Sequence, residues 1–250
     1  LASVDVSGLI QVNTTSGTIT LQENALVAAN DMTLISQTSD IVLPTSISLP
    51  GRLTLQGSQV NNAGQALETS VQELLIKTTA NQNLIINVDN TIVDVFMAGD
   101  GDLQVTSSTN LTLGDLDSDS YAATVSNGNI LLSTLAGDLD IEANISVSDT
   151  VADGVRGGTI ELSVTDGDLI IGALNSVAIT STNTVDQNAT GGLTADTGSQ
   201  VSIYAHLNDQ DDVSRTIALG NGNGSDVTVL AVGGDIFLDA LNGANSVTAN

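Results

Sequence analysis

One short phrase recurs along the chain: a glycine, a small polar residue, an apolar residue, any residue and a second apolar residue. Glycine adopts backbone angles that other residues avoid, and Asp or Asn bonds to its own backbone, so each copy begins with a turn. The alternating apolar residues predict a short strand with one buried face. A strand this short cannot bury that face alone, so many copies must stack. The copies read GTITL at 17–21, GDLQV at 101–105, GNILL at 128–132, GDLDI at 137–141, GTIEL at 158–162, GDLII at 167–171 and GDIFL at 234–238.

The spacing of the phrases predicts a repeating architecture. The copies that begin at 128 and 137, and those at 158 and 167, are about nine residues apart, as turn-separated short strands should be. Such pairs recur at intervals of roughly 20 to 30 residues, which is the range for one coil of a solenoid. We therefore expect an all-β fold, a right-handed parallel β-helix (β-solenoid) that covers 1–250 as a single segment. Variable polar surface loops are expected at 115–126, 144–157, 183–199 and 206–214.

The interior of such a stack must be aliphatic, because aromatic residues make up only 2% of the chain and Trp is absent. Apolar residues at equivalent positions of successive coils are expected to form continuous buried ladders. Asn129, Asp138, Asp168 and Asp235 occupy turn positions, where they are expected to stack coil upon coil and bond backbone groups. The predicted ladder residues are Ile130, Leu132, Leu139, Ile141, Ile160, Leu162, Leu169, Ile171, Ile236 and Leu238.

Composition excludes several classes of partner. The chain has 29 acidic residues against 4 basic ones, for a net charge of −25. Nucleic acid and anionic membranes both require clusters of Lys and Arg, so neither is an expected partner. No apolar run approaches the roughly 20 residues of a membrane-spanning helix, so membrane insertion is not expected. The chain has no cysteine, and its fold must therefore be stabilised by packing alone.

Two local features qualify this pattern. The segment GQALETSVQELLIK at 64–77 has apolar residues at helical spacing, so either a short helix or a strand ELLIK after a polar loop fits it. The two prolines, Pro44 and Pro50, are expected to bracket one turn and not to interrupt strands, because strand N–H groups serve the sheet.

Three alternating carboxylates form the main candidate metal site. In the segment DLDSDS, Asp115, Asp117 and Asp119 can turn toward one cation. Calcium takes six to eight oxygen ligands and tolerates irregular loops, so we expect calcium as the ion if one binds. The match to a helix-loop-helix calcium loop is incomplete, because Ser120 replaces its glycine and Ser126 its final glutamate. A solvated acidic loop is the alternative interpretation.

A second calcium hypothesis concerns NGNGSDVTV at 221–229. Gly222, Gly224 and Asp226 match the glycine-rich nonapeptide of calcium-binding β-rolls, whereas Asn221 replaces the first glycine. Those sites need adjacent copies, because each turn completes the site of its neighbour. A single copy is present, which favours an ordinary turn.

Catalysis is the alternative to a structural role. Asp209, Asp211 and Asp212 lie near His206 and Arg215 in the sequence, and paired carboxylates can cleave glycosidic bonds. Sugar-cleaving sites also use aromatic platforms, and the chain has only two Phe and two Tyr. We therefore expect a protein that is not an enzyme, with a β-helical polysaccharide-cleaving enzyme as the alternative.

The segments SNGNILLSTLAGDLDIEA at 126–143 and GGTIELSVTDGDLIIGAL at 157–174 resemble the repeats of large secreted bacterial exoproteins of the filamentous-haemagglutinin type. The resemblance implies a long parallel β-helix at the bacterial cell surface, exported by an outer-membrane secretion partner. It implies adhesion, biofilm or filament structure, or the stalk of a contact-dependent toxin. The secretion-domain motifs of that family are not found here, so we expect an internal fragment of a longer chain.

The expected function is a non-catalytic, structural or adhesive shaft segment of an extracellular protein. In this interpretation the solenoid is a rigid spacer and its loops contact a receptor or a glycan. A subunit that polymerises end to end into an extracellular fibre is a further alternative, because unpaired strand edges favour continuation of the stack.

Overall fold

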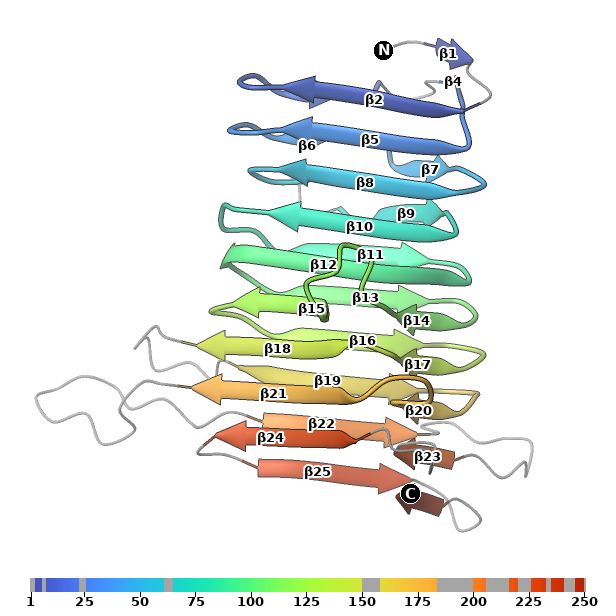
Figure 1. The fold of residues 1–250 in the computed structure, drawn as a ribbon, viewed down its shortest axis with the longest axis vertical. Coiled ribbons are helices and arrows are strands. Elements are labelled where there is room, and N and C mark those ends of the chain that lie inside the picture. Colours follow the sequence, from blue (N-terminus) through green and yellow to red (C-terminus); the bar gives the residue numbers. More distant parts are fainter. Residues whose placement is uncertain are drawn as a thin grey trace, which may run out of the picture.

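A computed structural model describes residues 3–5, 8–22, 26–60, 65–149, 158–183, 200–205, 216–219, 226–232, 235–240 and 246–249. Its regular secondary structure in these ranges consists only of β-strands, which lie in flat layers stacked along one long axis (Figure 1). The same ranges contain no helix that could cross a membrane. The expected all-β class is therefore confirmed for the described part of the chain.

Most strands belong to two large sheets. The long sheet follows the order β2 (Leu9–Thr14), β5 (Asp31–Ser36), β8 (Arg52–Gly57), β10 (Glu73–Thr78), β12 (Thr91–Asp100), β14 (Leu111–Leu113), β17 (Leu139–Ile141), β20 (Leu169–Ile171), β23 (Thr216–Leu219) and β26 (Ser246–Ala249), with β15 (Tyr121–Ser126), β18 (Asn144–Asp149), β21 (Val177–Asn183) and β24 (Val227–Val232) beside this path. The second sheet follows the order β7 (Ser46–Ser48), β9 (Leu67–Ser70), β11 (Leu84–Val88), β13 (Leu103–Ser107), β16 (Ile130–Thr134), β19 (Thr159–Val164), β22 (Gln200–Ala205) and β25 (Asp235–Ala240).

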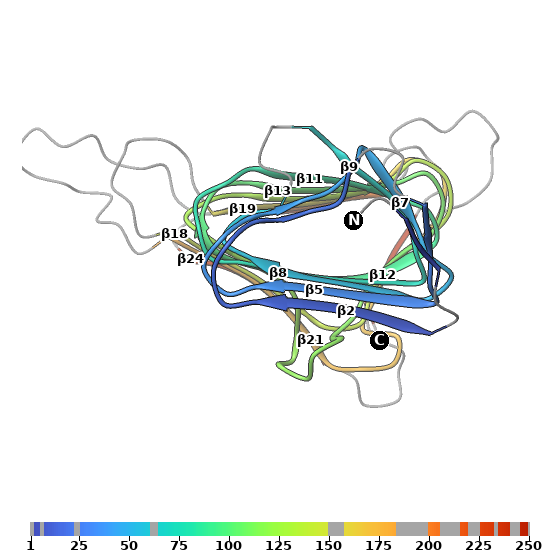
Figure 2. The ribbon, with the colours of Figure 1, turned by 90° about the horizontal axis from the view of Figure 1, so that it is seen from above.

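The remaining strands of the described part form two small two-stranded sheets. β1 (Ser3–Asp5) pairs with β4 (Leu26–Ala28), and β3 (Ile19–Thr20) pairs with β6 (Ile41–Val42). All of these pairings, in the large and the small sheets, are parallel, so a strand bonds to its counterpart one turn earlier or later and not to its neighbour in sequence. Viewed along the stack, the long sheet and the second sheet face each other (Figure 2).

The predicted repeat length of roughly 20 to 30 residues is confirmed by bonds between successive turns as far as β20, but the later turns are longer, since Val177 on β21 pairs with Val227 on β24. Equivalent positions that bond through a side chain are 19 to 21 residues apart in the early turns. In later turns the separation grows to 27 and then 30 residues. In the early turns the buried positions stay in register, because Leu34 pairs with Leu55, Leu55 with Ile76, and Ile76 with Val95. The register shifts at β15, once in its pairing with β12 and once in its pairing with β18.

The core lies between the two large sheets and is built from aliphatic ladders. In the second sheet Val105, Leu132 and Leu162 are in register and fully buried. The predicted ladder residues Ile130, Leu139, Ile141, Ile160, Leu169 and Ile171 are also buried. The prediction is wrong for Ile236, whose side chain is 44% exposed on β25, the last strand of the second sheet. The side chain of Leu238 lies outside the described set.

Asn and Asp side chains at the turns stack as predicted. The Asp102 N–H donates to Asn83 Oδ1 at 3.0 Å, and the Asn129 N–H donates to Asp102 Oδ1 at 2.9 Å. One turn later the Thr159 N–H donates to Asn129 Oδ1 at 3.0 Å. Each side chain thus satisfies a backbone donor of the following turn, where the strand ladder has not yet begun. A second ladder runs through Asn110, Asp138 and Asp168. The side chain of Asp235 is not described.

Several local expectations are corrected. The helical alternative at 64–77 is wrong, because β9 and β10 occupy most of that range and bury alternate residues against the core. Pro44 and Pro50 interrupt no strand, but they bracket the short strand β7 and not a turn. The loops predicted at 115–126 and 144–157 are too long, because β15 and β18 occupy part of each. The loops predicted at 183–199 and 206–214 lie almost wholly outside the described residues.

The long sheet divides at β12, and this division determines where the candidate site lies. The first part of β12 pairs with β14, and its second part pairs with β15. Residues 114–120 connect these two strands, so the chain leaves the sheet after β14 and returns at β15. The connection stands out from the outer face of the long sheet (Figures 1 and 2). We call it the acidic loop.

Candidate functional site

The acidic loop is organised by one of its own carboxylates. Asp115 Oδ1 accepts the backbone N–H groups of Ser118 at 2.6 Å and Asp119 at 3.1 Å, and Oδ2 accepts that of Ser120 at 2.9 Å. A further bond comes from the Asp117 N–H at 3.3 Å. Desolvation raises the pKa of the Asp115 carboxylate, but the four backbone N–H donors together outweigh this effect. The pKa of Asp115 is therefore lowered from its ordinary value. Asp115 is therefore an ionised centre around which the loop turns.

Asp94 lies beneath the acidic loop, on the outer face of β12. Its side chain would meet solvent in a bare sheet, but the loop covers it and leaves the residue 3% exposed. Asp94 Oδ2 accepts the Leu116 N–H at 2.8 Å. Burial raises the pKa of Asp94 to about 7, the bond from Leu116 opposes this, and the charges of Asp117, Asp119 and Asp115 add to the rise.

Two cations from earlier turns hold the loop against the sheet. Lys77 on β10 forms an ion pair with Asp117 through Nζ and Oδ2. Arg52 on β8 donates from Nη2 to the Leu116 carbonyl oxygen at 2.8 Å, and its Nη1 lies 3.8 Å from Glu73 Oε2. The chain has only four basic residues, so this loop engages half of them. The acidic loop is thus held at Leu116 by a hydrogen bond from Arg52 and at Asp117 by an ion pair with Lys77.

The structure assembles a different carboxylate set from the predicted one. Ligand atoms of Asp94, Asp115 and Asp117 lie within 4.8 Å of one another. The third predicted ligand, Asp119, is engaged elsewhere, because its Oδ1 accepts the Tyr121 N–H at 2.8 Å. Sequence reasoning missed Asp94 and Lys77. The signal for Asp94 was a single carboxylate at an outward position within the apolar run TIVDVFM.

The donor set fits a cation, and the ammonium of Lys77 already supplies one at Asp117. Both oxygens of Asp115 are occupied by backbone donors. A calcium ion would therefore bind chiefly through Asp94 and Asp117, and Lys77 would have to move aside. Hard oxygen ligands of this kind are those that calcium prefers.

The raised pKa of Asp94 gives a pH prediction. The folded chain keeps a proton on Asp94 that the unfolded chain releases, so the free energy of unfolding should fall as pH rises from about 4 to about 7. Asp140 on β17 acts in the same direction, because burial and then the nearby Glu142 raise its pKa to about 7. Asp94→Asn should be more stable than the wild type at pH 8, with the advantage shrinking toward pH 4. Urea unfolding at a series of pH values measures this, and a difference that does not vary with pH would contradict it.

The other predicted sites are not described. Residues 206–215, which include Asp209, Asp211, Asp212, His206 and Arg215, lie outside the described ranges. Of the nonapeptide at 221–229, only its last four residues are described, and most of them begin β24.

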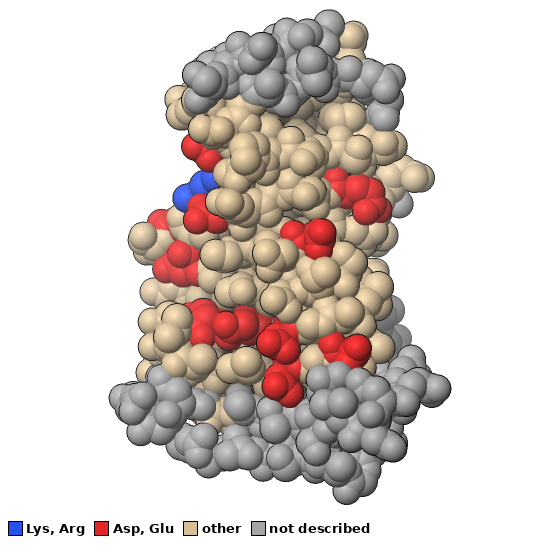
Figure 3. All heavy atoms as spheres, turned by 90° about the vertical axis from the view of Figure 1, so that its right-hand side faces the viewer, with Lys and Arg blue, Asp and Glu red and all other residues tan. Residues whose placement is uncertain are grey.

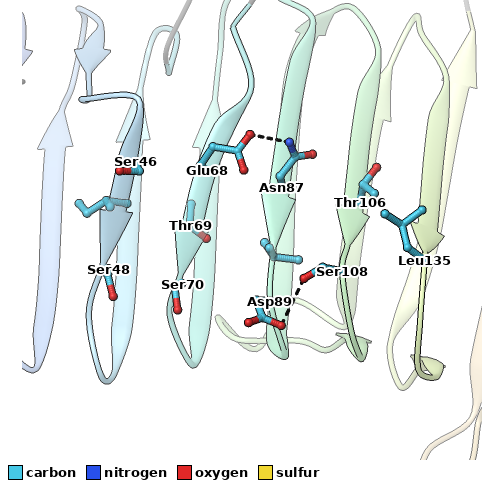
Figure 4. A pocket seen from close by; sticks show the side chains of 12 residues that line it. Ser46, Ser48, Glu68, Thr69, Ser70, Asn87, Asp89, Thr106, Ser108 and Leu135 are labelled. Atoms are coloured by element: carbon cyan, nitrogen blue, oxygen red, sulfur yellow. Dashed lines mark hydrogen bonds between the residues drawn. The ribbon is translucent and has the colours of Figure 1, made fainter.

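A second surface feature is a groove on the second sheet, near the ends of its strands. It has a volume of about 430 Å³ and crosses β7, β9, β11 and β13. Polar side chains line it, including Glu68, Asn87 and Asp89, and Leu135 closes one end (Figure 4). No sequence motif marked these residues, because they come from strands about 20 residues apart and meet only through the register of the turns.

Comparisons with known proteins identify no relative of this chain. The sequence matches no protein-family model, and neither a curated protein nor a solved structure is significantly similar to it.

Proposed function

We propose that this chain is a non-catalytic shaft segment of a secreted cell-surface protein, wound as a right-handed parallel β-helix that holds a contact surface away from its base. The observation that supports this most is the in-register ladder, which continues from turn to turn although the turns vary in length. Each turn is stabilised by its neighbours, so such a stack can extend without a new core. A stiff spacer is the role to which this construction is suited.

The surface charge supports an extracellular, solvated shaft. On the face shown in Figure 3, acidic side chains are spread along the described part of the stack, while basic atoms are confined to one spot. Mutual repulsion of this kind keeps a long β structure from associating sideways. The resemblance to exoproteins of the filamentous-haemagglutinin type extends the proposal to the bacterial cell surface and to an outer-membrane secretion partner.

The shape and the activity of the purified chain test this proposal together. Small-angle X-ray scattering should give the distance distribution of a rod, and surfaces coated with the protein should retain cells or glycans without changing them. Release of reducing ends or unsaturated sugars from polysaccharides would favour the enzyme instead. Filaments formed by the isolated chain would favour the self-assembling fibre, and a globular distance distribution would contradict all three.

We propose calcium as an optional ligand of the acidic loop, in competition with Lys77. Lys77→Met removes the ammonium from Asp117, so the variant should melt at a lower temperature in EDTA than the wild type. Calcium should then raise its melting temperature more than that of the wild type, by mass action on the folded state. Lys77→Met with Asp117→Asn is the matched control and should not respond. A Lys77→Met melting temperature that calcium leaves unchanged would remove calcium from this loop.

A further inference from the structure

We propose that the groove on the second sheet binds a neutral oligosaccharide, which specifies the contact surface of the proposed shaft and rests on that proposal. The groove is bordered by two polar rows that run along the stack, across the strands (Figure 4). Ser46, Glu68, Asn87 and Thr106 form one row, and they are in register on four successive strands. The second row includes Ser70, Asp89 and Ser108.

The spacing of these rows suits an extended chain of sugars. Adjacent strands lie about 4.8 Å apart, and positions two residues apart on a strand are separated by roughly 7 Å. A linear chain of pyranose rings has a repeat close to the strand spacing, so successive rings would meet equivalent polar side chains. The volume of about 430 Å³ is within the range of small-ligand sites.

Hydrogen bonds already orient the two carboxylates of the groove. Glu68 Oε1 accepts from Asn87 Nδ2 at 2.6 Å, and Asp89 Oδ1 accepts from the hydroxyl groups of Thr109 at 2.5 Å and Ser108 at 3.4 Å. In the described part of the chain, the second oxygen of each carboxylate has no hydrogen-bond partner. Two fixed acceptors and several hydroxyl groups are therefore available to a ligand that carries many hydroxyls. Preorientation of this kind lowers the entropy lost on binding.

One further lining residue adds an apolar contact to these polar groups. Thr69 does not add a polar one, because it points inward from β9, between the outward Glu68 and Ser70, and is in register with the buried Ile47. Leu135 is 55% exposed at the end of the groove and offers an aliphatic surface to the C–H face of a sugar ring.

The charge of the groove selects a neutral ligand. Its lining includes Glu68 and Asp89 and contains no Lys or Arg. A uronic-acid polymer would place carboxylates beside these two side chains, and like charges in close contact are unfavourable. Neutral hexose or pentose oligomers avoid this repulsion and still satisfy the acceptors.

Isothermal titration calorimetry with cellohexaose, mannohexaose, xylohexaose and galactohexaose tests the proposal, with hexagalacturonate as the charged comparison. We expect submillimolar binding of at least one neutral hexamer and no binding of hexagalacturonate. Glu68→Ala and Asn87→Ala should each weaken that binding about tenfold or more, which corresponds to one lost bond to a charged or fixed polar group.

Glu161→Ala is the matched control, because Glu161 is an outward-facing glutamate of the same sheet, on β19. It should leave binding within twofold of the wild type, and all variants should keep the wild-type circular dichroism spectrum. Absence of binding by every neutral hexamer, preference for hexagalacturonate, or equal losses in Glu68→Ala and Glu161→Ala would each overturn the proposal. A chain that binds no sugar but scatters as a rod would leave the shaft function intact.

Discussion

Replacing Gly128 by alanine is expected to lower the free energy of unfolding by about 3 kcal/mol, the upper end of the usual effect of overpacking. Gly128 lies just before β16, where its backbone lies close to the backbone of the preceding turn. A Cβ atom at this position would lie 2.5 Å from the carbonyl carbon of Gly101 and closer still to its oxygen. Both atoms belong to the backbone, and they could move only by opening the ladder between β13 and β16.

Gly8→Ala is the matched control for this prediction. A Cβ atom at Gly8 meets nothing within 4 Å, and neither glycine has a left-handed backbone. Both substitutions reduce the entropy of the unfolded chain equally, so their difference isolates the steric contact. Urea unfolding followed by circular dichroism should place Gly8→Ala within about 0.5 kcal/mol of the wild type. Equal midpoints for the two variants would mean that the turns do not approach as closely as described.

The recurring glycine illustrates what the sequence could predict. Its role in starting a turn is local, and the prediction holds at Gly101, which has a φ of 141°. The same phrase begins with Gly128, where the reason for glycine is the close approach of a neighbouring turn. That reason depends on which residues the register places one turn away, and short-range sequence patterns do not contain this information.

The strands themselves were predictable, but their distribution between the sheets was not. The phrases at 128–132 and 137–141 have the same local pattern, and they lead into β16 of the second sheet and β17 of the long sheet. Alternating apolar residues specify a strand and its buried face. They do not specify the corner between two strands, which decides the sheet that each strand joins.

The acidic loop shows the same limit at the level of a site. Asp115 and Asp117 were recognisable because they are neighbours in sequence. Lys77 and Arg52 come from strands that precede the loop by two and three turns, so only the register brings them to it. The division of β12 between β14 and β15, which allows the loop to lie over Asp94, likewise depends on pairing between distant segments.

Leu132→Ala is expected to destabilise the chain by about 2–5 kcal/mol, because it opens a cavity within a fully buried ladder. The adjacent Leu131→Ala is the control. Leu131 points outward and is only half-buried, so this substitution should lower the free energy of unfolding by about 1 kcal/mol or less. Hydrogen exchange adds a spatial test, because stability in a stack depends on neighbouring turns. Leu132→Ala should reduce amide protection in β13, β16 and β19 before it does so in β5 and β8. Equal losses of unfolding free energy in Leu132→Ala and Leu131→Ala would contradict the register. A loss of amide protection that is uniform over all these strands would show that the described turns unfold as one cooperative unit.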